Sequence, residues 1–491
     1  MIEAALAALG TLFTPSTLSF VLLGVGVGLL VGILPGLGGT VGMSLALPFI
    51  FGMDPDQAVA LLIGIAAVVH TADTFPSVLL GVPGSSGSQA TIMDGYPLAR
   101  QGQASRALAA AFFASMAGGV IGALCIFLVL PVARPMVLAF GSPELLMLAV
   151  LGLSMVGILS GERPARGVVM AASGLLLGAV GAAPATPFYR FTAGNLYLYD
   201  GIPLAVLALG LFALPEIMDL LAKGERIAAE GTQTARGGAL QGLKDVLASK
   251  WLVARSAVLG VGVGFIPGLG GSVVDWISYG VAARTSRDSE GFGSGDIRGV
   301  IAPESSNNAK EGGALIPTLL FGIPGSGATA VLLGGFIVLG LQPGPRMLTD
   351  NLDVTLLIIW TLALANVFGT LACLSVSGLV ARLAQVPAAR LAPFLLVIML
   401  VGAYQSTRSW GDLVAFLVIG TLAWFLRRAH YPLPPLLIGF VLSTSVERNL
   451  FLSVERYGWS WLGHPGVLVI TALTVALTWG SMRVTKRAEQ R

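Results

Sequence analysis

The sequence contains few charged residues. Only 11% of its 491 residues are Asp, Glu, Lys or Arg, whereas soluble domains average about 25%. Apolar residues make up 55% of the chain, and the mean hydropathy is +0.85. This balance excludes an ordinary water-soluble enzyme and predicts a membrane protein. The net charge of +3 is also too small to indicate nucleic-acid binding.

Side chains that carry chemistry are scarce as well. The two cysteines, Cys125 and Cys373, lie in apolar runs, where we expect packing residues rather than a disulfide or a metal site. The three histidines, His70, His430 and His464, are scattered without metal-ligand spacing. No Gly-x-x-x-x-Gly-Lys-Ser/Thr phosphate loop occurs. These absences argue against a membrane enzyme and against an ATP-driven pump, and we predict no enzymatic activity.

Long apolar stretches are abundant. A helix needs roughly 20 apolar residues to cross the hydrocarbon core of a bilayer, and several stretches here are shorter or broken by Gly and Pro. We therefore expect an all-α polytopic membrane protein with roughly 10–12 transmembrane helices and additional re-entrant hairpins. The 65 glycines favour this interpretation, because small residues let membrane helices approach closely.

Basic residues indicate the topology, because they concentrate in cytoplasmic loops. No Lys or Arg precedes Arg100, which argues against a secretory signal peptide and favours an N-terminus outside the cell. Basic residues gather in the segment 223–250, at Arg427 and Arg428, and in the tail 483–491. We expect these three regions, including the C-terminus, to be cytoplasmic.

Two motifs occur twice in the same order. Gly32–Gly39 (GILPGLGG) matches Gly264–Gly271 (GFIPGLGG), and Gly81–Ser85 (GVPGS) matches Gly322–Ser326 (GIPGS). Repeated halves with helix-breaking motifs are typical of secondary transporters. We predict two pseudo-symmetric, inverted repeats, centred on about residues 15–215 and 250–450. In these terms 1–222 holds the first repeat, 223–250 is a cytoplasmic linker, and 251–491 holds the second repeat with the basic tail.

The Pro-Gly breaks predict a substrate site. Backbone groups freed by Pro and Gly cannot face lipid, so they are expected to line a protein-enclosed cavity near mid-membrane, where helix N-termini can bind an anion. A kink or tight turn at the membrane surface is the alternative, and the hydroxyls could simply cap helices. The predicted substrate-binding residues are Pro35, Gly36, Gly38, Pro83, Gly84, Ser85, Ser86, Pro267, Gly268, Gly270, Pro324, Gly325, Ser326 and Thr329.

Ionisable residues within apolar sequence predict a second function, cation coupling, because charges in the membrane are costly. Asp73 and His70 would share one helix face and could bind a cation or a proton, or form a structural pair. Glu304, Asn307 and Asn308 offer oxygen ligands that suit Na⁺, or could hold the turns of a re-entrant loop. Less prominent polar candidates are a predicted surface ion pair and three single acidic residues: Asp94 with Arg100, Asp200, Glu216 and Asp275.

Five motifs together resemble a known family. They are PGLGG (35–39), DGYPLARQGQ (94–103), APESSNNA (302–309), GIPGSG (322–327) and LQPGP (341–345). In this order they resemble the large, TctA-type permease of tripartite tricarboxylate transporters, from about Leu18 to the region of Leu452.

That resemblance implies several properties. Such permeases lie in the bacterial inner membrane with a small membrane subunit, and a periplasmic solute-binding protein delivers the substrate. Uptake is secondary and driven by a cation gradient, with Na⁺ or H⁺ as the coupling ion and no other cofactor expected. The substrates are citrate and other di- and tricarboxylates. A stand-alone carrier or a channel for another small organic solute is the alternative interpretation.

Overall fold

The computed structural model describes residues 1–159, 164–223, 238–268, 270–286, 288–383 and 392–489. Most of these residues are helical, and one small antiparallel sheet joins β1 (Gly181–Ala182) to β2 (Tyr189–Arg190). The all-α prediction is therefore confirmed. Residues 224–237 of the predicted linker and Arg491 of the basic tail lie outside the described residues.

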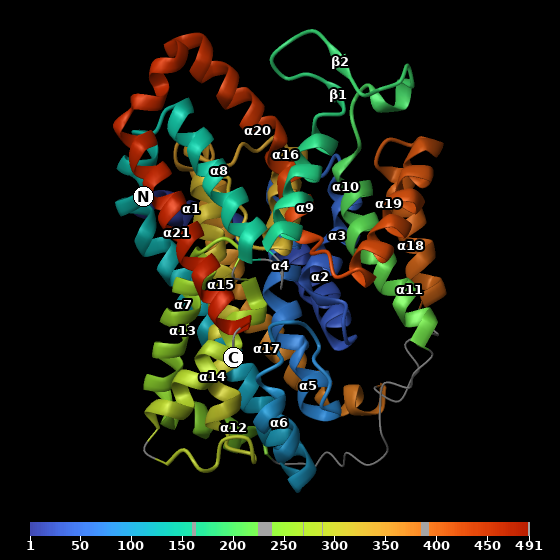
Figure 1. Ribbon diagram of the computed structural model, residues 1–491. Coiled ribbons are helices and arrows are strands. Elements are labelled where there is room, and N and C mark those ends of the chain that lie inside the picture. Colours follow the sequence, from blue (N-terminus) through green and yellow to red (C-terminus); the bar gives the residue numbers. More distant parts are fainter. Residues whose placement is uncertain (160–163, 224–237, 269, 287, 384–391, 490–491) are drawn as a thin grey trace.

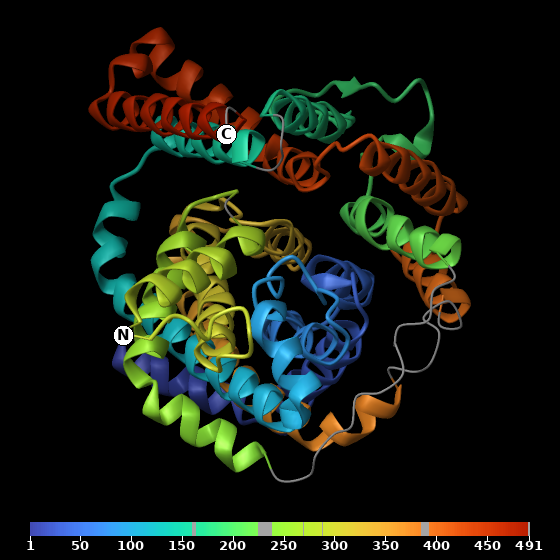
Figure 2. The ribbon, with the colours of Figure 1, turned by 60° about the horizontal axis from the view of Figure 1, so that its bottom comes forward.

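An inner body of long helices occupies the centre of the molecule (Figures 1 and 2). Helix α2 packs along α4, α13 packs along α15, and α7 and α17 join these two pairs. The long helices of the inner body are α2 (Pro15–Ile33), α4 (Pro55–Ala72), α7 (Ala104–Leu138), α13 (Lys250–Phe265), α15 (Arg298–Phe321) and α17 (Leu352–Leu383). Helix α1 (Ile2–Leu12) packs against α17 at the edge.

A second set, here called the outer helices, curves around part of the inner body (Figure 2). Helices α8, α9, α20 and α21 pack together, and α10, α11, α18 and α19 form a neighbouring group. The outer helices are α8 (Ser142–Leu159), α9 (Pro164–Gly178), α10 (Leu204–Ala208), α11 (Leu214–Lys223), α18 (Ala392–Gln405), α19 (Trp410–Arg428), α20 (Pro434–Tyr457) and α21 (Pro465–Glu489). The helical turns η3 (Leu196–Leu198), η4 (Leu209–Ala213) and η7 (Gly458–Gly463) connect them.

Short helices accompany the long ones of the inner body, and α3, α14, α16 and η5 among them follow a Pro-Gly pair. They are α3 (Gly38–Ala46), η1 (Leu47–Ile50), α5 (Thr74–Leu80), α6 (Ile92–Leu98), η2 (Ala99–Gln103), α14 (Gly270–Thr285), α16 (Gly327–Val338) and η5 (Pro345–Leu348). Helices α5 and α15 both end at a left-handed glycine, Gly81 and Gly322, each with φ +67°. Glycine reaches this conformation without the strain that a Cβ would add, so the chain reverses there.

Glycine also sets how closely the inner helices cross. A Cβ placed on Gly32 of α2 would lie 2.6 Å from the carbonyl oxygen of Val69 on α4. A Cβ on Gly264 of α13 would lie 2.2 Å from the carbonyl oxygen of Lys310 on α15. Both crossings therefore require glycine, as expected of membrane helices that pack backbone to backbone. These contacts fix the two helix ends that lead into the Pro-Gly turns.

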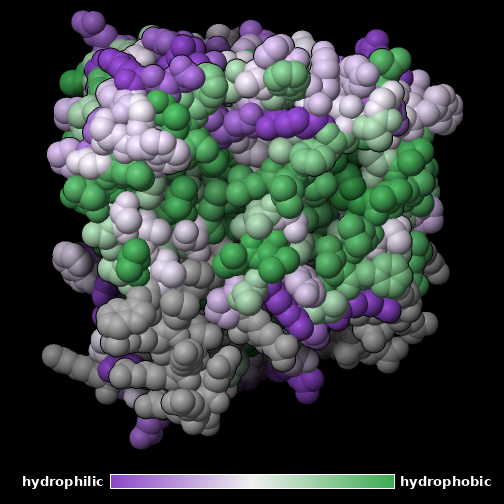
Figure 3. Space-filling view, turned by 45° about the horizontal axis from the view of Figure 1, so that its top comes forward, coloured by the Kyte–Doolittle hydropathy of each residue, from purple (hydrophilic) through white to green (hydrophobic). Residues whose placement is uncertain are grey.

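The lengths of the helices are those of a multi-pass membrane protein. In the described part of the chain, six helical stretches are long and apolar enough to cross a membrane: Pro15–Ile33, Pro55–Leu80, Ile92–Leu138, Leu352–Val380, Trp410–Arg428 and Pro434–Gly463. A bent pair, α12 (Ala239–Ala248) with α13, would make a seventh, and seven shorter apolar helices accompany them. A hydrophobic band crosses the face shown in Figure 3, with hydrophilic residues along its upper edge. The expected 10–12 spans would require several short helices to cross as well, and that number stays a prediction.

The described end of the predicted linker is helical. Helix α12 packs against α7, where Arg106 and Asp245 form an ion pair of 2.6 Å. Gly242 faces α7 so closely that a Cβ would lie 2.6 Å from the carbonyl oxygen of Arg106. This part of 223–250 is therefore held against the inner body.

Candidate functional site

The two motifs of each half meet at the same kind of contact. The backbone N–H of Gly36 donates to the carbonyl of Gly84 over 2.9 Å, and that of Gly268 donates to the carbonyl of Gly325 over 3.0 Å. Gly36 and Gly268 adopt φ +87° and +88°, a region that favours glycine. Each first Pro-Gly turn is thereby fastened to the second turn of its own half.

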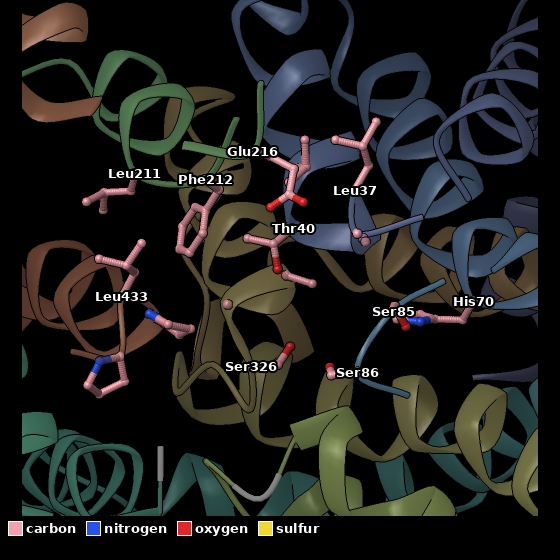
Figure 4. A pocket seen from close by; sticks show the side chains of 18 of the residues that line it. Leu37, Thr40, His70, Ser85, Ser86, Leu211, Phe212, Glu216, Ser326 and Leu433 are labelled. Carbon is pink, nitrogen blue, oxygen red and sulfur yellow. The ribbon is translucent and has the colours of Figure 1, made fainter. Parts of the chain in front are cut away.

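A cavity of about 800 Å³ lies between these turns and the outer helices. His70 and Ser85 lie on one side of it, and Leu211, Phe212 and Leu433 of the outer helices lie on the other (Figure 4). One wall is thus polar and rich in glycine, and the opposite wall is largely apolar. A mainly apolar pocket with a few converging polar groups is typical of a small-molecule site.

Many predicted substrate residues line this cavity. They are Gly36, Gly38, Pro83, Ser85, Ser86, Gly268, Gly325 and Ser326. Others lie beside them in the turns rather than in the cavity wall, namely Pro35, Gly84, Pro267, Pro324 and Thr329. Gly270 is the first residue of α14.

The serine and threonine hydroxyls have different surroundings. Ser326 is the N-cap of α16, because its Oγ accepts from the Thr329 N–H over 3.2 Å, and the Thr329 hydroxyl accepts in return from the Ser326 N–H over 2.8 Å. Ser85 donates its hydroxyl to Asp73 Oδ2. Ser86 is exposed in the cavity. Ser326 and Thr329 therefore have the capping role that the sequence left open, and Ser85 is tied to the acidic residue of its half.

A buried group of charged side chains forms the polar wall. His70 Nε2 lies 3.0 Å from Glu311 Oε1, and its Nδ1 lies 3.6 Å from Asp73 Oδ2. Lys310 Nζ lies 2.6 Å from the same Glu311 oxygen. His70, Lys310 and Glu311 all line the cavity. The structure thus brings His70 and Asp73 together, as predicted, and adds two charged residues that the sequence analysis did not single out.

Glu304 lies deeper, away from the cavity wall. Its carboxylate is fully buried and accepts three hydroxyls: Thr91 at 2.7 Å, Ser115 at 2.9 Å and Thr74 at 3.0 Å. Thr74 follows Asp73 directly, so Glu304 is joined to the same end of α4. Three hydroxyl donors stabilise a buried carboxylate that would otherwise be costly.

The two asparagines offer oxygen atoms that no hydrogen bond uses. Asn308 donates its amide to Thr71 Oγ1 and to Asn366 Oδ1, each over 2.8 Å. Asp73 Oδ1, Asn307 Oδ1 and Asn308 Oδ1 are buried and have no hydrogen-bond partner among the described residues. Carboxylate and amide oxygens of this kind suit a hard cation such as Na⁺. The described part of the chain contains no cluster of three or more His, Cys, Asp or Glu suited to a metal ion.

The three single acidic candidates lie in different parts of the fold. Glu216 lines the cavity from α11 and pairs with Arg427 of α19, which also lies 3.6 Å from Asp219. The sequence around Glu216 is apolar and does not show which residue balances its charge, because Arg427 lies more than 200 residues further along the chain. Asp275 accepts the N–H of Ala90 over 3.0 Å, which joins α14 to the first half. Asp200 lines a separate pocket beside α10.

The predicted surface pair between Asp94 and Arg100 is wrong. Asp94 is fully buried, and its oxygens accept from Tyr279 Oη at 2.9 Å and from the N–H groups of Gly295 and Asp296. Arg100 instead lies over the ring of Tyr96. The sequence could not reveal this, since all three donors to Asp94 come from the other half of the chain.

This architecture defines a class: a multi-pass membrane protein with a cavity, polar along one wall, between paired helix breaks. The model of the "Tripartite tricarboxylate transporter TctA family" matches residues 18–438. The chain belongs to that family. The resemblance to this family that the five motifs indicated is thereby confirmed over nearly the whole sequence.

Two curated relatives from Agrobacterium vitis are similar to this chain. The "Uncharacterized 52.8 kDa protein in TAR-I ttuC' 3'region" is 33% identical over 440 residues, which cover 90% of this chain and 87% of the relative. The "Uncharacterized protein in TAR-II ttuC' 3'region" is 33% identical over 188 residues, covering 38% of this chain and 78% of the relative. No solved structure matches the chain.

Proposed function

We propose that this chain is the large permease subunit of a secondary transporter that imports di- or tricarboxylates, citrate among them, together with a coupling cation. The cavity between the two pairs of Pro-Gly turns carries the proposal. It is lined by backbone turns, hydroxyls and a buried cation, Lys310. These are the groups that bind carboxylates in a membrane interior.

The coupling site is proposed beside this cavity. Asp73 faces both His70 and Ser85, and Asn307 and Asn308 hold unused oxygens on the adjoining turn of α15. Oxygen ligands next to a substrate site would let Na⁺ bind together with the substrate, whereas the His70–Asp73 contact would serve a proton. With either ion, the cation and the solute would bind next to each other and cross the membrane in the same conformational change.

We further propose that the two halves are pseudo-symmetric and inverted, and that the inner body moves against the outer helices. The matching hydrogen bonds of Gly36 and Gly268 and the left-handed glycines Gly81 and Gly322 support equivalent turns in both halves. Alternating access by movement of one bundle around a mid-membrane site fits such turns.

The proposed setting is the bacterial inner membrane, with residues 223–250 and the C-terminus in the cytoplasm. A small membrane subunit and a periplasmic solute-binding protein would complete the system. The family carries this part of the proposal, together with the distribution of basic residues.

Reconstitution tests the proposal. The chain would be placed in liposomes with its small subunit and binding protein, and uptake of labelled citrate, malate and succinate measured under a Na⁺ or a pH gradient. We expect uptake that needs the binding protein and one of the gradients. Uptake that ignores both gradients would favour a channel, and uptake that is unchanged without the partner proteins would favour a stand-alone carrier.

A further inference from the structure

One oxygen of Glu311 contacts two buried nitrogen-bearing side chains. Its Oε1 lies 2.6 Å from Lys310 Nζ and 3.0 Å from His70 Nε2. The side chains are 5%, 7% and 10% exposed for Lys310, Glu311 and His70. All three line the cavity. A carboxylate between two nitrogen donors at the edge of a cavity is the arrangement that a bound carboxylate ligand would also take.

The position of Lys310 is fixed by its backbone rather than by this pair alone. Helix α13 crosses α15 at Lys310, where Gly264 leaves no room for a Cβ beside the Lys310 carbonyl. The ammonium group therefore reaches the cavity from a rigid point. A lysine ammonium has three donors, so it can keep one contact while it exchanges another.

Other charged groups surround the pair. Asp73 lies on the far side of His70, and Glu304 of α15 accepts the hydroxyl of Thr74, the residue after Asp73. Across the cavity, Arg427 is held by Glu216 and Asp219 of α11. Among the described lining residues, Lys310 and Arg427 are the Lys and Arg side chains, and Arg427 already faces two carboxylates.

We infer that Lys310 is the anchor for a carboxylate group of the transported solute, and that Glu311 is a tethered carboxylate which occupies this anchor when the solute is absent. This inference rests on the proposed function and deepens it. The solute carboxylate competes with Glu311 for Lys310 Nζ and His70 Nε2. The rest of a di- or tricarboxylate then lies among Ser85, Ser86 and Ser326, which line the same cavity.

A carboxylate of the protein at Lys310 stabilises the carrier while no solute is bound. An uncompensated buried ammonium is strongly destabilising, so the carrier without solute needs a counter-charge at Lys310. A carboxylate of the protein supplies it without blocking the site permanently, because the exchange replaces one ion pair by another. A ligand without a carboxylate cannot make this exchange and is excluded.

The alternative is an ion pair that only maintains the fold, and three variants separate the two cases. Equilibrium binding of labelled citrate, malate and succinate would be measured with the full chain in lipid nanodiscs. We expect Lys310→Gln to weaken binding about 30-fold or more, as for the loss of one partner of a buried charge contact. We expect Glu311→Gln to bind as tightly as the unaltered chain or more tightly, because the competitor is gone.

The double variant Lys310→Gln/Glu311→Gln decides the matter even where a single variant is unstable. If Lys310 anchors the solute, the double variant stays as weak as Lys310→Gln while its thermal stability recovers. If the pair only maintains the fold, removing both charges restores binding together with stability, which would overturn the inference. Lys244→Gln, an exposed change on α12, serves as the matched control.

Failure of the inference differs from failure of the proposed function. Binding of carboxylates by the unaltered chain with no effect of Lys310→Gln contradicts the inference alone. Absence of any carboxylate binding by the unaltered chain contradicts both. The neutral amides of malate and succinate provide the specificity control, and tight binding of these amides would also count against a carboxylate anchor.

Discussion

His70 Nε2 lies 3.0 Å from Glu311 Oε1, and each residue stands thirteen positions before the proline of its half, Pro83 or Pro324. Two residues at the same distance before the repeated Pro-Gly-Ser motif are therefore in contact. One half supplies an imidazole there and the other a carboxylate. The chemistry at the centre is thus asymmetric, although the turns around it match.

Asp73 contacts His70 and is the acidic residue that we propose for binding the coupling cation or proton. We predict that Asp73→Asn raises the cation concentration for half-maximal uptake by about tenfold to a hundredfold. Losing a hydrogen bond to a charged group costs about 1.5–3 kcal/mol, and each 1.4 kcal/mol is tenfold in affinity. The measurement is citrate uptake in liposomes against Na⁺ concentration and, separately, against pH.

Asp350→Asn is the matched control for Asp73→Asn. The Asp350 side chain is 67% exposed and lies 4.0 Å from Arg346 on the surface, so its loss should leave the cation dependence unchanged. A normal cation dependence in Asp73→Asn would remove Asp73 from the coupling site.

A second prediction concerns the crossing of α13 and α15. Gly264→Leu places a Cβ where the Lys310 carbonyl oxygen lies 2.2 Å away. We expect a loss of about 2 kcal/mol or more of stability, since overpacking forces backbone shifts. Thermal unfolding of the purified protein in detergent measures the effect.

Gly262→Leu is the control for this crossing, on the same helix and two residues earlier. A Cβ at Gly262 meets nothing within 4 Å, so this variant should unfold near the temperature of the unaltered protein. Equal destabilisation of both variants would show that leucine in α13 is harmful for a reason other than the close crossing.

The turns of the site could be predicted from sequence because their residues are locally informative. Pro-Gly pairs mark breaks wherever they occur in apolar sequence, and their repetition placed Gly36, Ser85, Gly268 and Ser326 in one cavity. Local sequence also located the paired residues Asp73 and His70, three positions apart.

The rest of the site depends on contacts between distant parts of the chain. Lys310 and Glu311 follow Asn308 in α15, where the neighbouring sequence is rich in polar residues, so the local sequence did not mark their charges as buried. Nothing local indicates that they meet His70, or that Asp94 is enclosed by residues of the second half. The place of the outer helices around the cavity also required the fold, because the contacts of Arg427 with Glu216 and Asp219 join segments that lie far apart in the sequence.

The third prediction concerns which end of the molecule faces the cytoplasm. Figure 1 places β1 and β2 at one end and α6 and α12 at the other. Ser289 belongs to the latter end, because its loop is joined to Gln101, just after α6, by a hydrogen bond from Gln101 Nε2 to the Ser294 carbonyl. Thr186 lies between the strands, and both residues are exposed.

Replacing Cys125 and Cys373 by alanine gives a background for labelling these positions. With α12 in the cytoplasm, we expect Ser289→Cys to react with a membrane-impermeant maleimide only in inside-out vesicles. Thr186→Cys should react only in right-side-out cells. The reverse pattern would invert the proposed topology, and labelling of both from one side would contradict the membrane orientation itself.

The last prediction tests whether the solute occupies the cavity. Ser86 is exposed in the cavity wall, so Ser86→Cys in the same cysteine-free background should react with a small maleimide. We expect citrate and the coupling cation together to slow that reaction about tenfold or more, because a ligand in a pocket buries most of the surface it covers. Ser289→Cys, far along the chain and outside the cavity, should react at an unchanged rate. Equal rates at Ser86→Cys with and without the solute and the cation would show that the solute does not occupy this cavity, and would return the turns to the alternative of surface kinks.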